Sequence, residues 1–201
     1  MAYKVFSEHR NGNSIPWPVM MAAYSENGLG LPVQQLFQKM QKQQINKDKN
    51  TFSYALKACA QTEAHKEGRL IHDQILKFSW DQDLVIGNSL IDMYVKCGGL
   101  NTAQKVFEKL PFRNEVSWNT LIAGYSELGH SMEAIKCFEV MLQEGIFPSI
   151  VSFVCVLKAC SSTGNIAKGE VIHAQIERQG LVKGDIFIGS TLVDMYAKNG
   201  S

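Results

Sequence analysis

The sequence lacks an excess of charge of either sign, since 20 Lys and Arg residues stand against 19 Asp and Glu residues in 201, for a formal net charge of +1. Proteins that bind nucleic acid indiscriminately rely on many phosphate contacts, so this balance leaves only local contacts with a polyanion. The sequence also lacks any apolar run near the roughly 20 residues of a membrane helix, and we expect no membrane partner. The composition, 45% hydrophobic, is that of a globular chain.

Paired cysteines are missing as well. The five cysteines are odd in number and have no CxxC spacing, which favours a reducing compartment over a disulfide framework. They fall within predicted helices or at their ends, where a thiol behaves as a small hydrophobe and a zinc site would need closer paired ligands: Cys59, Cys97, Cys137, Cys155 and Cys160.

Sequence patterns of known catalytic sites are absent too. His65-Lys66-Glu67 matches the H-x-E part of the zinc deaminase signature, but P-C-x-x-C does not follow it, and we place these residues in a hairpin turn as a chance match. There is no phosphate-cradling glycine loop and no Ser/His/Asp constellation. The sequence therefore predicts no enzyme activity, no metal and no cofactor in this chain.

Residues 115–149 predict one helical hairpin. In the first half, apolar and aromatic residues from Val116 to Tyr125 follow one helix face, and the second half repeats this from Met132 to Met141. Gly129 suits the end of the first helix, and Ser131 is the expected N-cap of the second. Two such helices cannot bury both apolar faces against each other, so the hairpin needs neighbours.

The chain is internally repeated. Trp17 and Trp118 are 101 residues apart, and Leu56-Lys57-Ala58-Cys59 returns at the same offset as Leu157-Lys158-Ala159-Cys160. Ile71-His72 likewise returns as Ile172-His173. Since a stretch of 101 residues is too long for one hairpin, the repeat predicts several hairpins in each round.

Turn residues divide each round into three hairpins of unequal length. The predicted units are a tail of an earlier unit at 1–13, then 14–48, 49–83, 84–114, 115–149, 150–185 and a truncated unit at 186–201. Each unit reads helix, turn, helix, and no window alternates with period two for long enough to predict a strand. The predicted fold is all-α. Units stacked in this way form a solenoid whose end units lack neighbours on one side.

The units resemble the pentatricopeptide repeat family, and their alternating lengths resemble its plant subclass of regular, long and short repeats. The resemblance covers essentially the whole chain and is carried by residues 116–125 (VSWNTLIAGY), 156–160 (VLKAC) with Ile172-His173, and 90–98 (LIDMYVKCG). It implies a right-handed α-solenoid that binds single-stranded RNA with one nucleotide per unit, in mitochondria or chloroplasts. Residues 1–4 lead into repeat-like sequence with no visible transit segment.

The resemblance also implies which residues read the bases. In the family they are the fifth residue of a unit and the last residue before the next unit. The corresponding pairs are Pro18 with Asp48, Ser53 with Asp83, Asn88 with Asn114, Asn119 with Ser149, and Val154 with Asp185, while Ser190 stands without a partner. Asn88 and Asn119 would favour pyrimidines, and the unit with Asn119 and Ser149 would favour cytosine. Pro18 and Val154 depart from the pattern because neither has a side-chain donor.

Two further roles follow from the resemblance. The apolar second residue of a unit would wedge between adjacent bases, at Ile15, Val85, Val116, Val151 and Phe187. Lys96 and Lys198, in the first helices of the short units, could reach phosphates, whereas the equivalent Glu26 and Glu127 could not. The plain alternative for the Asn and Lys residues is a solvated helix surface. His72 and His173 recur in apolar faces, where packing is favoured over catalysis.

Three functions are compared at this point. The first is an RNA-binding α-solenoid within an organellar RNA-processing or RNA-editing factor, with single-stranded RNA and other RNA-processing proteins as partners and any catalytic extension outside this chain. The second is a protein-binding scaffold like the tetratricopeptide repeats, which would show a period near 34 residues. The third, an independent enzyme, has no supporting residues. The unequal unit lengths and the positions of Asn88 and Asn119 favour RNA.

Overall fold

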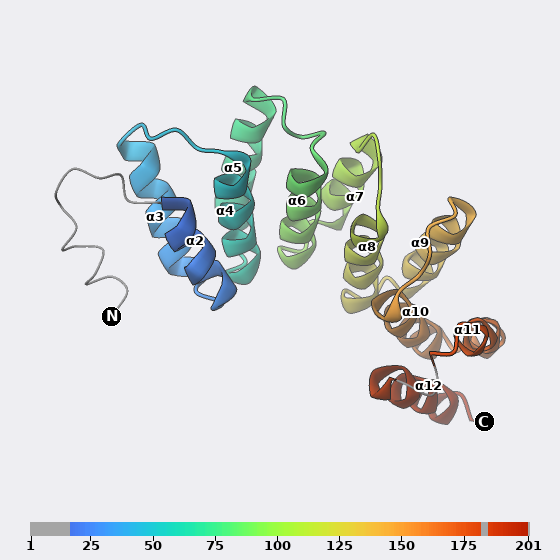
Figure 1. The fold of residues 1–201 in the computed structure, drawn as a ribbon. Coiled ribbons are helices and arrows are strands. Elements are labelled where there is room, and N and C mark those ends of the chain that lie inside the picture. Colours follow the sequence, from blue (N-terminus) through green and yellow to red (C-terminus); the bar gives the residue numbers. More distant parts are fainter. Residues whose placement is uncertain (1–16, 182–184, 201) are drawn as a thin grey trace.

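The computed structural model describes residues 17–181 and 185–200, and within these ranges it contains eleven α-helices and no strand (Figure 1). The all-α prediction is therefore confirmed. The helices are α2 (Trp17–Glu26), α3 (Gly30–Lys42), α4 (Lys49–Gln61), α5 (His65–Lys77), α6 (Leu84–Lys96), α7 (Leu100–Lys109), α8 (Glu115–Glu127), α9 (Ser131–Gln143), α10 (Ile150–Thr163), α11 (Ile166–Arg178) and α12 (Ile186–Lys198). The predicted tail unit at 1–13 and the wedge residue Ile15 lie outside the described residues.

The helices form two rows. The even-numbered helices α2, α4, α6, α8, α10 and α12 pack each against the next, whereas α3, α5, α7, α9 and α11 contact only even-numbered helices within the described part of the chain. Because the first row is continuous and the second row is splayed, the array curves with the even-numbered helices on its inner side. Figure 1 shows this arc, with α9 and α11 on its outer side. The fold is an α-solenoid.

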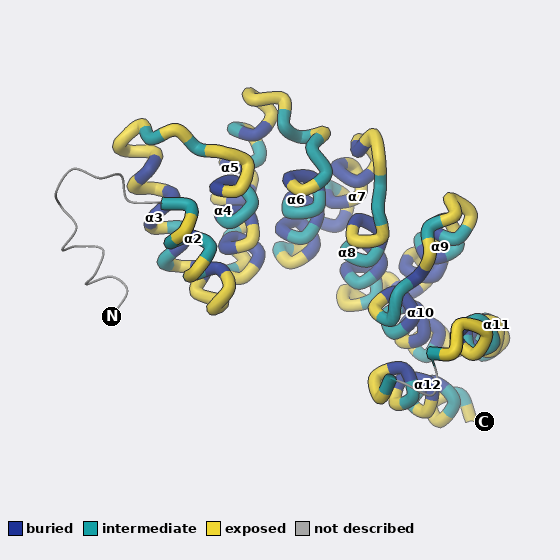
Figure 2. Tube along the Cα trace, viewed as in Figure 1, coloured by how far each residue is buried: buried dark blue, intermediate teal, exposed yellow. Residues whose placement is uncertain are grey.

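A single core runs between the two rows along the array. Aromatic residues bridge successive hairpins: the ring of Phe37 packs edge-on against Phe52 at 5.6 Å, and Phe107 packs edge-on against Trp118 at 4.7 Å. Phe52, Phe138 and Phe153 are fully buried. Buried residues occur in every helix, while exposed residues lie at the turns and on the outward sides of the helices (Figure 2). Each hairpin thus buries its apolar faces against its neighbours.

The turns show why the helices end where they do. Gly98, Gly129 and Gly164 have φ values of 74°, 82° and 68°, a region that residues with a Cβ adopt only at a cost. Two local expectations are wrong. Ser131 is the first residue of α9, and the N-cap is His130, whose side chain makes no cap hydrogen bond. Residues 65–67 form the first turn of α5 rather than a hairpin turn, because Ala64 already caps that helix.

No helix in the described part of the chain is long and apolar enough to cross a membrane.

Candidate nucleic-acid interface

Each even-numbered helix carries a stripe of residues that faces away from the core. On α8 the stripe runs through Val116, Asn119 and Glu127, at spacings of three and eight residues, which keep side chains on one helix face. On α6 the corresponding residues are Val85, Asn88 and Lys96. Since α6, α8 and α10 lie side by side, their stripes form one continuous surface. We call this surface the reading face, defined by Val85, Asn88, Lys96, Val116, Asn119, Glu127 and Val151.

The Asn119 side chain is bonded to the next unit. Its amide nitrogen Nδ2 donates to the Ser149 hydroxyl at 3.0 Å and to the Glu115 carboxylate at 3.1 Å. Its carbonyl oxygen Oδ1 accepts from the Ser152 hydroxyl at 2.5 Å. Asn119 and Ser149 are both half-buried, so each still presents one side to solvent. The structure thus brings together the pair that the sequence predicts.

The second predicted pair is also in contact. Asn88 Nδ2 donates to Asn114 Oδ1 at 3.4 Å, and Asn88 Oδ1 accepts from the Ser117 hydroxyl at 2.7 Å. Asn114 Oδ1 also accepts the backbone N–H of Ser117 at 3.0 Å. The two Asn pairs therefore have the same arrangement one unit apart: an amide nitrogen directed to the last residue of the unit, and an amide oxygen directed to a buried serine.

The other predicted pairs do not form this arrangement. Ser53 bonds Ser89 at 2.7 Å between the hydroxyl oxygens, while Asp83 binds the Lys49 ammonium at 2.5 Å. Ser190 is exposed and donates to the Phe187 carbonyl at 3.0 Å. The remaining pairs, Pro18 with Asp48 and Val154 with Asp185, have no side-chain hydrogen bond available to Pro18 or Val154.

The last residue of each unit has a structural role as the N-cap of the next helix. Asp48 caps α4, Asp83 caps α6, Asn114 caps α8, Ser149 caps α10 and Asp185 caps α12. Asp, Asn and Ser are the residues that N-caps favour. Capping alone would explain these residue types, so the distinctive feature of Asn114 and Ser149 is their additional bond to an Asn on the reading face.

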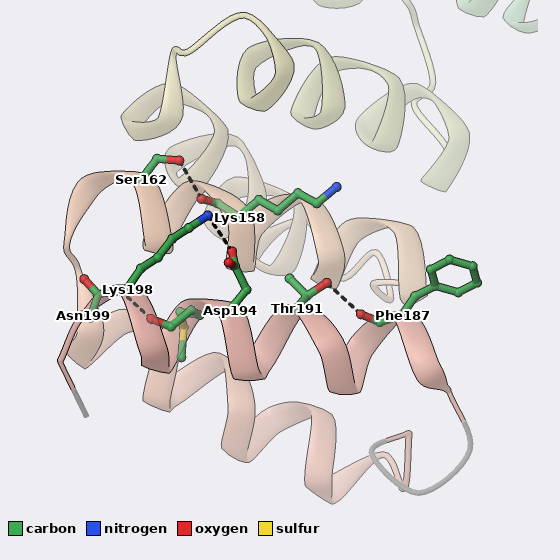
Figure 3. A network of polar contacts seen from close by, with 8 residues as sticks. Lys158, Ser162, Phe187, Thr191, Asp194, Lys198 and Asn199 are labelled. Carbon is green, nitrogen blue, oxygen red and sulfur yellow. Dashed lines mark hydrogen bonds and ion pairs between the residues drawn. The ribbon is translucent and has the colours of Figure 1, made fainter.

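The predicted wedge residues are exposed in spite of being apolar. Val85 is 59% exposed, and Val116 and Val151 are each 53% exposed. Phe187 is 70% exposed, and its ring points away from the neighbouring helices in Figure 3. Spaced one per unit, these side chains offer apolar surfaces on both sides of Asn119.

The predicted phosphate lysines are paired with carboxylates. Lys96 binds Glu127 of the next unit at 2.8 Å, and Lys198 binds Asp194 on its own helix at 2.9 Å (Figure 3). The hydrogen bond from Lys96 to Glu127 raises the pKa of the Lys96 ammonium. Nearby, burial raises the pKa of Asp92, with the Lys96 and Lys57 charges opposing it. A phosphate would have to compete with these carboxylates.

A pocket of about 230 Å³ joins these features, between α6, α8 and the start of α10. Its lining includes Asp92, Lys96, Asn119, Glu127 and Val151. A predicted reading residue, a predicted wedge residue and a paired lysine therefore border one depression. It is large enough for part of a nucleotide and open to solvent.

Sequence reasoning missed Ser117 and Ser152, which hold the two Asn side chains. Both are the third residue of their units and are fully buried, as is Thr51 at the same position of the unit 49–83. The recurrence of a hydroxyl residue at this position was visible in the sequence. The short units have Ile86 and Ile188 there instead.

The recurring thiols and imidazoles have packing roles. Burial raises the pKa of Cys59 to about 12 and the pKa values of Cys137 and Cys160 to about 11, so these thiols stay protonated at neutral pH. His72 bonds the Tyr94 hydroxyl at 2.8 Å, and His173 bonds the Tyr196 hydroxyl at 2.9 Å. Within the described residues no group of three or more His, Cys, Asp or Glu is placed to hold a metal.

Comparison with known proteins matches these repeats to a family. The model of the PPR repeat matches residues 17–45 and 88–114, and the model of the PPR repeat family matches residues 113–162. This chain contains pentatricopeptide repeats.

Relatives with pentatricopeptide repeats occur in Arabidopsis thaliana. One pentatricopeptide repeat-containing protein is 37% identical over 180 residues, covering 89% of this chain and 23% of the relative. A chloroplastic one is 35% identical over 197 residues, covering 98% of this chain and 32% of the relative. A mitochondrial one is 35% identical over 199 residues, covering 99% and 19%. The chain spans less than a third of the length of each of these three relatives.

A solved structure shares the fold. The crystal structure of the pentatricopeptide repeat protein PPR10 from maize has a TM-score of 0.70 at 21% identity, covering 99% of this chain and 30% of that one. PPR10 in complex with an 18-nucleotide psaJ RNA element has a TM-score of 0.61 at 18% identity, covering 98% and 34%.

Proposed function

We propose that this chain binds single-stranded RNA sequence-specifically, with one nucleotide per pentatricopeptide repeat. The observation that carries the proposal is the Asn119–Ser149 pair, half-buried and hydrogen-bonded between the exposed Val116 and Val151. Splayed bases of single-stranded RNA are read by hydrogen bonds to their edges and by stacking on flat or apolar side chains. The RNA bound to the similarly folded PPR10 supports this function.

The proposed contacts follow the geometry of the reading face. A base enters beside Asn119, where it takes the place of Glu115 as a partner of Nδ2, while Val116 and Val151 cover its two faces. Asn88 reads the preceding unit's base in the same way. We propose a pyrimidine at both positions, with cytosine opposite the unit 115–149. Lys96 and Lys198 contact phosphates after exchanging their carboxylate partners.

We further propose the biological setting. The chain is the binding part of a mitochondrial or chloroplast factor that edits or processes RNA together with other RNA-processing proteins. Catalysis, where the whole protein has it, lies outside these residues. The repeats belong to the subclass of alternating regular, long and short units. The helix starts at Lys49, Leu84, Glu115, Ile150 and Ile186 support this subclass because their spacing is uneven.

Selection of RNA from a randomised single-stranded pool by the 201-residue chain, extended by whole repeats if affinity requires it, tests the function. We expect enrichment of pyrimidines at the two adjacent nucleotides opposite units 84–114 and 115–149. Asn119→Ala should then weaken binding by about 1–3 kcal/mol at one nucleotide only. A chain that is folded by circular dichroism yet retains no RNA at moderate salt would refute the proposal. Capture of a peptide instead would support the tetratricopeptide-like scaffold.

A further inference from the structure

We infer that the buried hydroxyls of Ser117 and Ser152 are specificity-determining positioning groups, each of which fixes the amide orientation of the reading Asn in the preceding unit. The inference rests on the proposed RNA binding and extends it. Neither serine touches solvent, so each acts on RNA through Asn88 or Asn119. The decisive feature is the direction of the hydrogen bonds.

The Ser152 hydroxyl has one hydrogen to donate, and its surroundings decide where that hydrogen goes. Its oxygen accepts the backbone N–H of Ser149 at 3.0 Å, and its hydrogen goes to Asn119 Oδ1 at 2.5 Å. On the other side of the amide, Asn119 Nδ2 donates to Ser149 Oγ. If the amide were flipped, Nδ2 would face the Ser152 hydroxyl and Oδ1 would face Ser149. Both the donation from Ser152 to Oδ1 and the donation from Nδ2 to Ser149 would then be lost. The carbonyl end of Asn119 is therefore held inward.

As a consequence, the group of Asn119 that faces the proposed RNA is the hydrogen-bond donor Nδ2. The second Nδ2 hydrogen bonds only the exposed Glu115 carboxylate at 3.1 Å, which a base can replace. A base edge with an acceptor at that place is matched, such as N3 or O2 of cytosine, whereas a donor there is opposed. An amide that is free to flip would accept either, because it offers N–H on one side and C=O on the other.

The chain contains its own comparisons. Ser117 has a similar arrangement for Asn88: its hydroxyl donates to Asn88 Oδ1 at 2.7 Å, and Asn114 Oδ1 is a second, longer acceptor at 3.0 Å. Thr51 has the same position and burial, but the preceding unit has Pro18 at its fifth position, and the Thr51 hydroxyl donates to the cap residue Asp48 instead, at 2.5 Å. Where Ile86 stands at the third position, the preceding unit has Ser53 rather than Asn. The two reading Asn residues are those followed by a buried serine.

The test measures base selectivity in Ser152→Ala. For the full 201-residue chain, dissociation constants are measured for the pool-selected RNA and for versions with each other base opposite unit 115–149 or opposite unit 84–114. The selectivity ratio is the dissociation constant for a substituted base divided by that for the selected base. We expect this ratio to fall roughly five- to tenfold at the nucleotide opposite unit 115–149, as expected for losing one hydrogen bond. The ratio opposite unit 84–114 should not change. Ser117→Ala should show the reverse.

Matched variants separate positioning from stability. Thr51→Val removes an equivalent buried hydroxyl and should leave both ratios unchanged. Ser152→Thr should keep the selectivity, because Thr51 shows that a threonine fits this position. Equal weakening for every RNA in Ser152→Ala would overturn the inference and assign the serine a purely structural role. A wild-type chain that binds no RNA would instead refute the proposed function itself.

Discussion

At the scale of single residues, the Asn, Lys and Glu side chains of the reading face already have internal partners. Asn119 uses its donors and an acceptor on Ser149, Glu115 and Ser152, and Lys96 is paired with Glu127. The proposed RNA binding is therefore an exchange of partners, and its net strength depends on how easily the internal partners leave. Glu115 and Glu127 are exposed and leave easily, whereas the buried Ser152 does not.

The Lys96–Glu127 ion pair gives a prediction about affinity. Glu127→Gln frees the Lys96 ammonium for a phosphate and removes a negative charge from the reading face, so RNA should bind roughly two- to fivefold more tightly at low salt, the effect of an exposed ion pair. The gain should fade as salt screens the charges. Filter binding across a salt series measures it.

Glu144→Gln is the control for this prediction. It breaks the ion pair of Glu144 with Arg113, which also links two successive units at 3.1 Å but lies outside the reading face. RNA affinity should not change in this variant. If both variants, or neither, alter binding, Lys96 does not contact phosphate in the way proposed.

At the scale of helices, the N-cap residue Asp83 joins two units, because it caps α6 and also binds a lysine of the unit before. Asp83 Oδ1 accepts the N–H groups of Val85 and Ile86 at 3.1 and 3.2 Å, while its other oxygen binds Lys49 in the unit before. Asp83→Ala should lower the free energy of unfolding by about 1 kcal/mol through loss of the cap. Urea denaturation measures this loss.

The pH dependence of this contact has a definite sign. The Lys49 hydrogen bond, together with the cap hydrogen bonds, holds the pKa of Asp83 below its ordinary value of 3.8. The unfolded chain therefore binds the proton more readily, and the stabilisation is present above pH 3.8 and lost as the pH falls through the folded-state pKa. The stability difference between wild type and Asp83→Asn should shrink below about pH 4. A difference that is just as large in a Lys49→Met background would contradict Lys49 as the main cause of the lowered pKa.

Helix contacts also depend on glycine at one close approach. A Cβ at Gly124 of α8 would lie 2.6 and 2.7 Å from the two γ-carbons of the buried Val95 on α6. Valine is rigid, so Gly124→Ala should destabilise the chain by about 1–3 kcal/mol despite its better helix propensity. Gly189→Ala in α12 is the control, since nothing lies within 4 Å of its added Cβ, and it should stabilise by up to ~1 kcal/mol. Thermal denaturation of both variants measures these changes in stability.

The helices were predictable from sequence because period, caps and glycines act locally. Hairpin 115–149 shows this well, with helices at Glu115–Glu127 and Ser131–Gln143. The pairing of Asn119 with Ser149 came only from the family resemblance. The roles of Ser117 and Ser152 and the pairing of Lys96 with Glu127 join different units through contacts 29 to 33 residues apart. Such contacts depend on how hairpins stack, which no local pattern specifies.

At the scale of the whole molecule, each unit in the described part of the chain touches only its neighbours, so stability adds up along the array rather than from one central core. Helices α6 and α8 have an even-numbered neighbour on both sides. Among the described residues, helix α2 packs only on α3 and α4, and α12 only on α10 and α11. The predicted reading residues Asn88 and Asn119 therefore lie on helices that are supported on both sides.

This arrangement predicts a gradient of local stability. In hydrogen exchange of the 201-residue chain, amides in α6 and α8 should be protected roughly tenfold or more beyond those in α12, corresponding to ~1.4 kcal/mol or more in opening free energy. A single internal control is available, because α6 and α12 have closely similar sequences, LVIGNSLIDMYVK and IFIGSTLVDMYAK, and differ mainly in their neighbours. Equal protection of α6 and α12 would mean that the chain opens as one cooperative unit. Protection that falls from α6 to α12 would show that neighbours, not local sequence, hold the reading face in place.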